Sequence, residues 1–277
     1  MTRRGTLATD RHGALGAQPL APVRDTLAAM AARPELPPLV GLAPGLIATA
    51  GHGWIPATDL IDGDRADGRA LDDFLDAAKQ RWQASPHAAA ALAWKSYTYW
   101  LALPAVLGYA VARRVPLVRP DSVLACWAPR SPFVAVGLGD VEVAVLAADP
   151  LAIGGPGARV RVVADDAALL VELRASLMDQ HLDPVMEQIR DRVHLGRRTL
   201  WGSLASGIAY GMSRAADFVP APVLPTTSEI LTALGLDDLV ELAPRRDGRP
   251  GLEVQRRTCC LAFTLPEPKI CSGCCIR

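Results

Sequence analysis

Five of the six cysteines of this 277-residue chain lie in its last nineteen residues, and four of them form a spaced motif. The motif is an adjacent pair, Cys259 and Cys260, followed by ten residues, Cys271, two residues and Cys274. Thiolates are preferred protein ligands for iron–sulfur clusters and for zinc, and four of them complete either kind of site. The spacing therefore predicts a metal site formed by these four residues.

The spacing favours an iron–sulfur cluster and leaves structural zinc open. Zinc modules usually present two Cys-x-x-Cys turns, and here only Cys271 to Cys274 has that form. Adjacent side chains in an extended chain point to opposite faces, so a single ion would need a bent backbone at Cys259-Cys260. A two-iron cluster is larger and accepts sulfur atoms from a broader arc. Two disulfides are the third alternative, and they would require an oxidising compartment.

Composition narrows the function classes. The chain has 29 basic and 29 acidic residues, and this balance argues against a nucleic-acid surface. No apolar run follows Arg3 and Arg4, so we expect no export signal and a cytoplasmic protein. The uncharged stretch Ser96 to Ala112 is interrupted by Pro104 and Gly108, which favours a buried core helix over a membrane span. Peripheral membrane contact stays open.

Hydrophobic periodicity predicts helices that flank a block of strands, which indicates an α+β fold. The body, residues 1–254, should be mostly helical around a small antiparallel sheet, with a loosely structured, Pro- and Gly-rich start over 1–65. Residues 255–277 should form a C-terminal cysteine-rich iron–sulfur module. The expected helices are 24–32, 69–84, one opened by Ser85-Pro86, 166–179, 183–193, 197–214 and 228–234, and the expected strands are 122–127, 132–138, 141–146 and 159–163.

Two local signals make sharper predictions. Gly139-Asp140, between two apolar runs, has the form of a two-residue hairpin turn. Asp183-Pro184 has the form of an N-cap followed by a first-turn proline, so a helix should begin there.

Two stretches carry a resemblance to a known family. The tail reads Arg256-Arg257-Thr258-Cys259-Cys260-Leu261, then after the ten-residue spacer Cys271-Ser272-Gly273-Cys274. Upstream lie His181-Leu182-Asp183-Pro184 and Arg198-Thr199-Leu200-Trp201-Gly202-Ser203-Leu204-Ala205-Ser206. Together they resemble the FhuF-like ferric siderophore reductases over roughly residues 165 to 277. The cysteine spacing is the specific part of the likeness.

The resemblance implies a [2Fe-2S] cluster held by Cys259, Cys260, Cys271 and Cys274. It also implies one-electron reduction of a ferric siderophore, of hydroxamate type, without a catalytic acid, base or nucleophile. Cys275 directly follows Cys274 and departs from the family pattern, and we expect that it is not a ligand. A zinc-stabilised binding protein without redox function and a ferredoxin-like electron carrier remain the alternatives.

Other residues give weaker signals. Gly137 and Gly139 lack the third glycine of a dinucleotide site, so electrons should come from a separate ferredoxin or NAD(P)H-dependent reductase. Trp201, His181 and Cys126 are most simply core residues. A basic rim before the cysteines could attract an acidic donor; its members are Arg245, Arg246, Arg249, Arg256 and Arg257, against Asp247 and Glu253.

Overall fold

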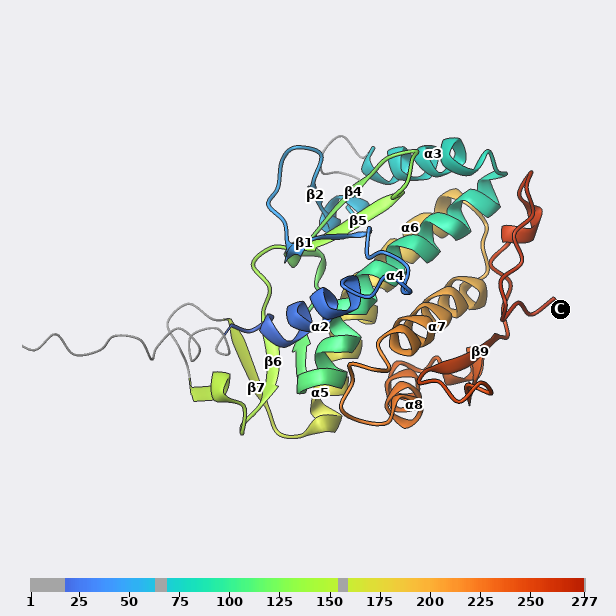
Figure 1. Cartoon of the computed structure of the whole chain (residues 1–277). Coiled ribbons are helices and arrows are strands. Elements are labelled where there is room, and N and C mark those ends of the chain that lie inside the picture. Colours follow the sequence, from blue (N-terminus) through green and yellow to red (C-terminus); the bar gives the residue numbers. More distant parts are fainter. Residues whose placement is uncertain (1–17, 63–68, 154–158, 277) are drawn as a thin grey trace, which may run out of the picture.

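The computed structural model describes residues 18–62, 69–153 and 159–276, and these form an α+β fold (Figure 1). Its α-helices are α2 (Ala21–Ala31), α3 (Ala70–Trp82), α4 (Pro86–Ala112), α5 (Asp166–Arg174), α6 (Asp183–Arg192), α7 (Arg197–Arg214) and α8 (Val223–Leu234). Its strands are β1 (Leu42–Ile47), β2 (Ile55–Pro56), β3 (Arg114–Pro116), β4 (Val123–Trp127), β5 (Val134–Leu138), β6 (Val143–Leu146), β7 (Val160–Val163), β8 (Val240–Pro244) and β9 (Leu252–Arg256). The mixture of helices and small sheets that the sequence predicts is confirmed.

Helix α4 forms the centre of the molecule. The Ser85 side chain accepts a hydrogen bond from the Ala88 backbone N–H at 3.4 Å, and Pro86 occupies the first turn, as the sequence predicts. The helix packs against α7, α3 and α2, and most of its side chains are buried. The predicted buried core helix is therefore confirmed. Among the described residues, no helix combines the length and apolar character needed to cross a bilayer.

The strands form three small sheets instead of one. Their orders are β1-β5-β4-β2, β3-β6-β7 and β8-β9, and the pairs β1–β5 and β6–β7 are parallel. The hairpin predicted at Gly139-Asp140 is wrong, because β5 and β6 belong to different sheets. Strand β5 already lies between β1 and β4, so neither of its edges is open to β6. The turn residues change the direction of the chain without pairing the strands that they join.

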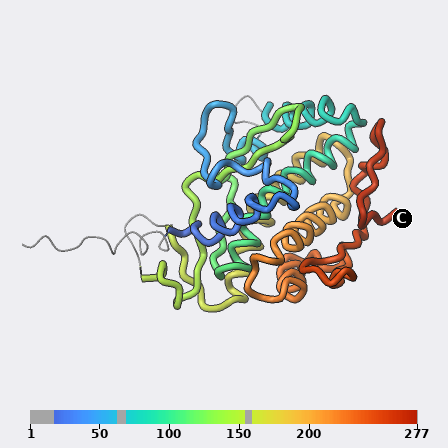
Figure 2. The backbone as a smooth tube through the Cα atoms, viewed as in Figure 1, coloured from blue at the N-terminus to red at the C-terminus, as the bar shows by residue number. Residues whose placement is uncertain are grey.

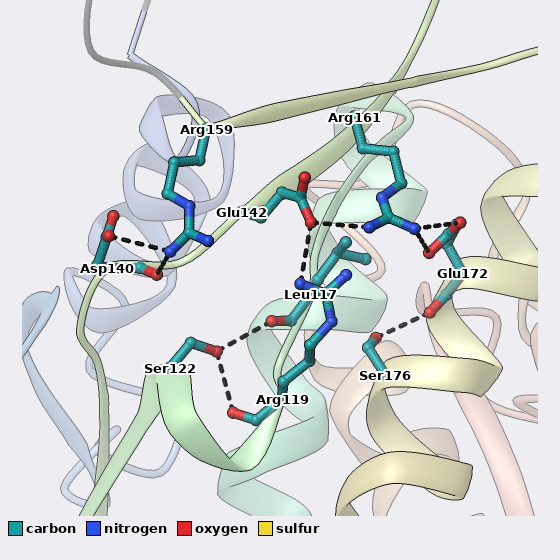
Figure 3. Close-up of polar contacts among 9 residues, drawn as sticks. All are labelled: Leu117, Arg119, Ser122, Asp140, Glu142, Arg159, Arg161, Glu172 and Ser176. Carbon is teal, nitrogen blue, oxygen red and sulfur yellow. Dashed lines mark hydrogen bonds and ion pairs between the residues drawn. The ribbon is translucent and has the colours of Figure 1, made fainter.

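A charged network joins the β3-β6-β7 sheet to α5 (Figure 3). Glu142 accepts hydrogen bonds from Arg119 at 2.9 Å and from Arg161 at 3.2 Å. Arg161 also pairs with Glu172 of α5 at 3.1 Å. These groups are partly exposed, so each pair adds little stability, but together they fix the sheet against the helix that leads to residues 175–192.

Helix α6 runs from Asp183 to Arg192, close to the predicted 183–193, but it is not a separate helix with its own cap. Helix α5 continues through a π-helical segment, Ala175–Leu182, directly into α6. Asp183 makes no capping hydrogen bond and instead pairs with Arg197 at 2.8 Å, so the N-cap prediction is wrong. The widened π turns precede Pro184, whose ring and missing N–H would disturb a regular α-helix.

His181, in the π-helical segment, is fully buried and holds this segment to α4. Its Nδ1 lies 2.6 Å from the Val118 carbonyl oxygen, and its Nε2 lies 2.6 Å from the Tyr97 hydroxyl. A carbonyl only accepts, so Nδ1–H donates to Val118 and Nε2 accepts from Tyr97. The histidine is thus a satisfied core residue, as predicted.

Because His181 is buried, we expect the free energy of unfolding to depend on pH. Burial lowers the pKa of His181 from its ordinary value of 6.5 to about 4. Between these values the unfolded chain binds a proton that the folded chain does not, so the free energy of unfolding falls as pH falls. From pH 7 to pH 5 the loss from this group should be roughly 2 kcal/mol. Denaturant unfolding of the wild type and His181→Gln at both pH values checks this; an equal loss in both proteins would contradict it.

The C-terminal part of the body is α7, α8 and the antiparallel β8–β9 hairpin, which packs on α7. Helix α7 has the predicted bounds, and α8 begins earlier than predicted, at Val223. The hairpin was not predicted, and the boundary predicted between residues 254 and 255 falls inside β9. The predicted loose start, 1–65, contains α2, β1 and β2, while 1–17 and 63–65 lie outside the described residues.

Candidate metal centre

The adjacent cysteines lie in a tight bend directly after β9. Leu261 adopts a left-handed conformation, with φ of 61°, and its N–H points to the Cys259 sulfur at 3.3 Å. A short 3-10 turn, Ala262–Thr264, follows, and the Lys269 N–H returns to the Ala262 carbonyl at 3.0 Å. The chain therefore turns directly after Cys260, so the geometry here does not by itself exclude a single ion.

The second pair of cysteines forms a turn that is fixed to the edge of β9. Within the turn, the Cys274 N–H donates to the Cys271 carbonyl at 3.2 Å. The Arg256 N–H donates to the Gly273 carbonyl at 2.9 Å, and the Gln255 side chain donates to the Cys274 carbonyl at 3.0 Å. We call Cys271–Cys274 the knuckle. These bonds place the knuckle beside the strand that leads into Cys259, so they bring the two halves of the motif together.

All four predicted ligands line one cavity of about 210 Å³. Cys260 and Cys274 are buried, and Cys259 and Cys271 are partly exposed. Cys275 and Cys126 do not line the cavity. The remaining lining residues are Trp82, Leu92, Lys95, Ala262, Phe263, Leu265, Lys269 and Ile270.

The cysteines are free thiols, with no disulfide between them. Within the part of the chain that the structure describes, no group of three or more His, Cys, Asp or Glu side chains is arranged to hold a metal ion. The residues fit an iron–sulfur cluster or zinc through their donor chemistry and through the cavity that they share. They do not form a ready-made coordination sphere.

The body supplies one wall of this cavity and part of its charge. Leu92 of α4 packs with Cys260, Ala262 and Leu265 in a small apolar cluster beside Trp82. Burial raises the pKa of the Cys271 thiol, and the positive charges of Lys95 and Arg256 act in the opposite direction. The sequence analysis did not identify Lys95. It is the single charged residue (Asp, Glu, Lys or Arg) in the segment Pro86–Ala112. A single charge in such an apolar helix is a signal that could have identified it.

The predicted basic rim is wrong for Arg256, which is only 2% exposed. Most of the other members pair with carboxylates at the surface. Arg245 bonds to Asp247 at 2.9 Å, and Arg246 pairs with Glu253 at 3.2 Å. Arg257 pairs with Glu241 at 2.8 Å. The surface near the cysteines is thus closer to neutral than the sequence suggests.

The other candidate residues from the sequence lie in other parts of the fold and do not line the cysteine cavity. Trp201 packs edge-on against the buried Trp94, with ring centroids 5.8 Å apart. Arg198 pairs with Asp238 at 2.5 Å. Cys126 lies on β4 and is partly, not fully, buried. The structure therefore does not bring these three side chains to the cysteine cavity.

A larger cavity, of about 900 Å³, also borders the knuckle. Helix α7 and the β8–β9 hairpin form most of it, and Ser272 and Gly273 of the knuckle complete its wall. In Figure 2 the chain after β9 continues along the same side of the molecule. The knuckle therefore borders both cavities: its cysteines line the smaller one and its two central residues line the larger one.

No family model matches the chain, and no curated protein matches it.

Proposed function

We propose that this chain binds a [2Fe-2S] cluster through Cys259, Cys260, Cys271 and Cys274 and reduces ferric siderophores in the cytoplasm. The observation that carries the proposal is the shared cavity: the four cysteines of the spaced motif line it, and the other two do not. The resemblance of the tail to the FhuF-like reductases, which rests on the spacing of the same cysteines, also supports it.

In this function a cluster supplies one electron at a time. The cysteine thiolates hold it, and Leu92 and Trp82 keep one side of the cavity apolar. In the overall reaction a reduced donor protein loses one electron, and the siderophore-bound Fe(III) gains it. The resulting Fe(II) is a softer ion that fits the hard oxygen donors of a siderophore poorly, so it is released. No acid, base or nucleophile is needed.

The 900 Å³ cavity is the substrate site in this proposal. Its volume is at the upper end of the range of about 300–1,000 Å³ that is typical of small-molecule sites. It borders the knuckle, so a siderophore bound there would contact Ser272 and Gly273, which lie between the two proposed ligands Cys271 and Cys274.

Charge at this cavity favours a substrate with little net charge. Arg245 and Arg246 line it together with their carboxylate partners Asp247 and Glu253. Three hydroxamate groups, each a monoanion, offset the charge of one Fe(III). A ferric hydroxamate therefore suits this surface better than a strongly anionic complex.

The direct test is anaerobic purification followed by iron and sulfide analysis and EPR of the reduced protein. The proposal expects a red-brown protein with paired iron and sulfide whose visible absorption bleaches on reduction. A colourless protein with stoichiometric zinc would instead support the zinc-stabilised alternative. A bleaching protein that transfers no electron to any ferric hydroxamate, with a ferrous chelator as trap, would support the electron-carrier alternative.

Filling the larger cavity should slow the reaction without affecting the metal centre. Ala243 of β8 lines this cavity and is exposed, so Ala243→Trp adds bulk where the substrate would bind. The rate at which reduced protein is oxidised by a ferric hydroxamate should fall by roughly tenfold, the scale of a lost binding contact. The visible spectrum should stay unchanged. Ala147→Trp, an exposed position just after β6, is the matched control. Equal rates in both variants would place the substrate elsewhere.

A further inference from the structure

Arg256 is a buried cation whose hydrogen-bonding groups are mostly unsatisfied. Its side chain is 2% exposed. Nη2 donates to the Ser203 hydroxyl at 3.2 Å, while Nε and Nη1 are buried without a hydrogen-bond partner. Among the described residues, no carboxylate forms an ion pair with it, whereas its neighbour Arg257 is exposed and paired with Glu241 at 2.8 Å.

A guanidinium in this state is unfavourable by itself. Removing a charge from water has a large cost, which is offset only when an opposite charge and hydrogen bonds replace the lost hydration. Arginine keeps its proton under all ordinary conditions, so it cannot escape the cost by becoming neutral. The fold therefore places a permanent positive charge where a negative group is required.

The surroundings of Arg256 identify where that negative group would be. The backbone N–H of Arg256 is bonded to the knuckle at Gly273, and Cys259 follows three residues later. Gly273 lies between Cys271 and Cys274 in the sequence, so the Arg256 backbone is bonded to the turn that carries two of the cysteines. On the other side, α7 fits closely: a Cβ on Gly202 would lie 1.9 Å from the Thr258 hydroxyl. Arg256 thus lies between α7 and the cysteine motif.

We propose that Arg256 compensates the negative charge of the metal group held by Cys259, Cys260, Cys271 and Cys274, and thereby makes that group easier to reduce. This inference rests on the proposed function. A two-iron cluster with four thiolate ligands is negatively charged, and reduction makes it more so. Nearby charge is an established determinant of cluster potential.

Arg256→Gln is the test, with Arg257→Gln as the matched control. Both remove one arginine charge from adjacent positions, but only the first removes a buried one. The midpoint potential of the cluster should become more negative in Arg256→Gln by about 59 mV or more, which is a tenfold change in the reduction equilibrium of a one-electron couple. The potential of Arg257→Gln should equal that of the wild type.

A second measurement separates charge compensation from a packing role. In the metal-free protein the unpaired charge is a cost, so metal-free Arg256→Gln should melt at the same temperature as the wild type or higher. A residue needed only for packing would lower the melting temperature with and without metal. Arg256→Lys keeps the positive charge, so its potential should stay closer to that of the wild type than to that of Arg256→Gln.

The outcomes are distinguishable. If the wild type takes up no cluster, the proposed function fails, whatever the variants do. If the wild type binds the cluster and Arg256→Gln has the same midpoint potential as Arg257→Gln, only the role of Arg256 is overturned. That role is also overturned if Arg256→Lys shifts the potential as much as Arg256→Gln does. Loss of the cluster in Arg256→Gln with retention in Arg256→Lys supports charge compensation.

Discussion

Replacing Cys271 by serine is expected to give a folded, colourless protein. Serine offers a hard hydroxyl in place of a soft thiolate, and iron–sulfur clusters select thiolates. Changes to outer-shell partners alone typically cost about 10–100-fold in metal affinity, so loss of a direct ligand should reduce the iron content to background. Cys259→Ser should behave in the same way. Iron and sulfide per chain after anaerobic reconstitution, with the visible spectrum, measure this effect.

The choice of positions keeps the cysteine experiment interpretable. Cys259 and Cys271 are partly exposed, whereas Cys260 and Cys274 are buried, and Cys260 packs against Leu92. Serine at the two buried positions would therefore also disturb packing. Cys275→Ser is the matched control, because Cys275 follows the motif directly but does not line the cavity. Full iron content in Cys271→Ser, or iron loss in Cys275→Ser, would overturn the ligand assignment.

Adding one methyl group to the knuckle, by Gly273→Ala, is expected to abolish cluster binding without touching a sulfur atom. A Cβ at this position would lie 1.8 Å from the backbone carbonyl oxygen of Val254. A backbone atom of a paired strand cannot rotate away, so the knuckle must move from β9 and the bond from the Arg256 N–H to Gly273 must break. The two halves of the motif then separate, and iron content should fall by roughly tenfold or more.

Gly139→Ala is the control for the effect of glycine replacement in general. A Cβ there would meet its nearest neighbour, a methyl of Leu124, at 3.7 Å, an ordinary contact distance. Both variants should retain the far-ultraviolet circular dichroism of the wild type, because overpacking at one turn typically costs about 1–3 kcal/mol. Wild-type iron content in Gly273→Ala would indicate that the knuckle does not depend on its contact with β9.

Local signals in the sequence predicted the elements well where a few neighbouring residues decide the outcome. Ser85-Pro86 begins α4, and the apolar stripe of residues 197–214 gives α7 with the predicted bounds. The same kind of signal failed at Gly139-Asp140, and at Asp183 the expected cap is absent although α6 has nearly the predicted bounds. At Gly139-Asp140 the strands that pair with β5, which are remote from the turn, decided the outcome. At Asp183 the helix continues from the π segment directly before it.

For the candidate site, the sequence by itself determined which four cysteines form the spaced motif, because residue type and spacing belong to the covalent chain. Only the tertiary structure decided that Arg256 is buried while Arg257 is exposed, and that Lys95 and Leu92 of a distant helix line the cysteine cavity. The physical reason is that the burial and the charge of a site depend on which remote segments pack against it. The spacing of residues along the chain does not specify those segments.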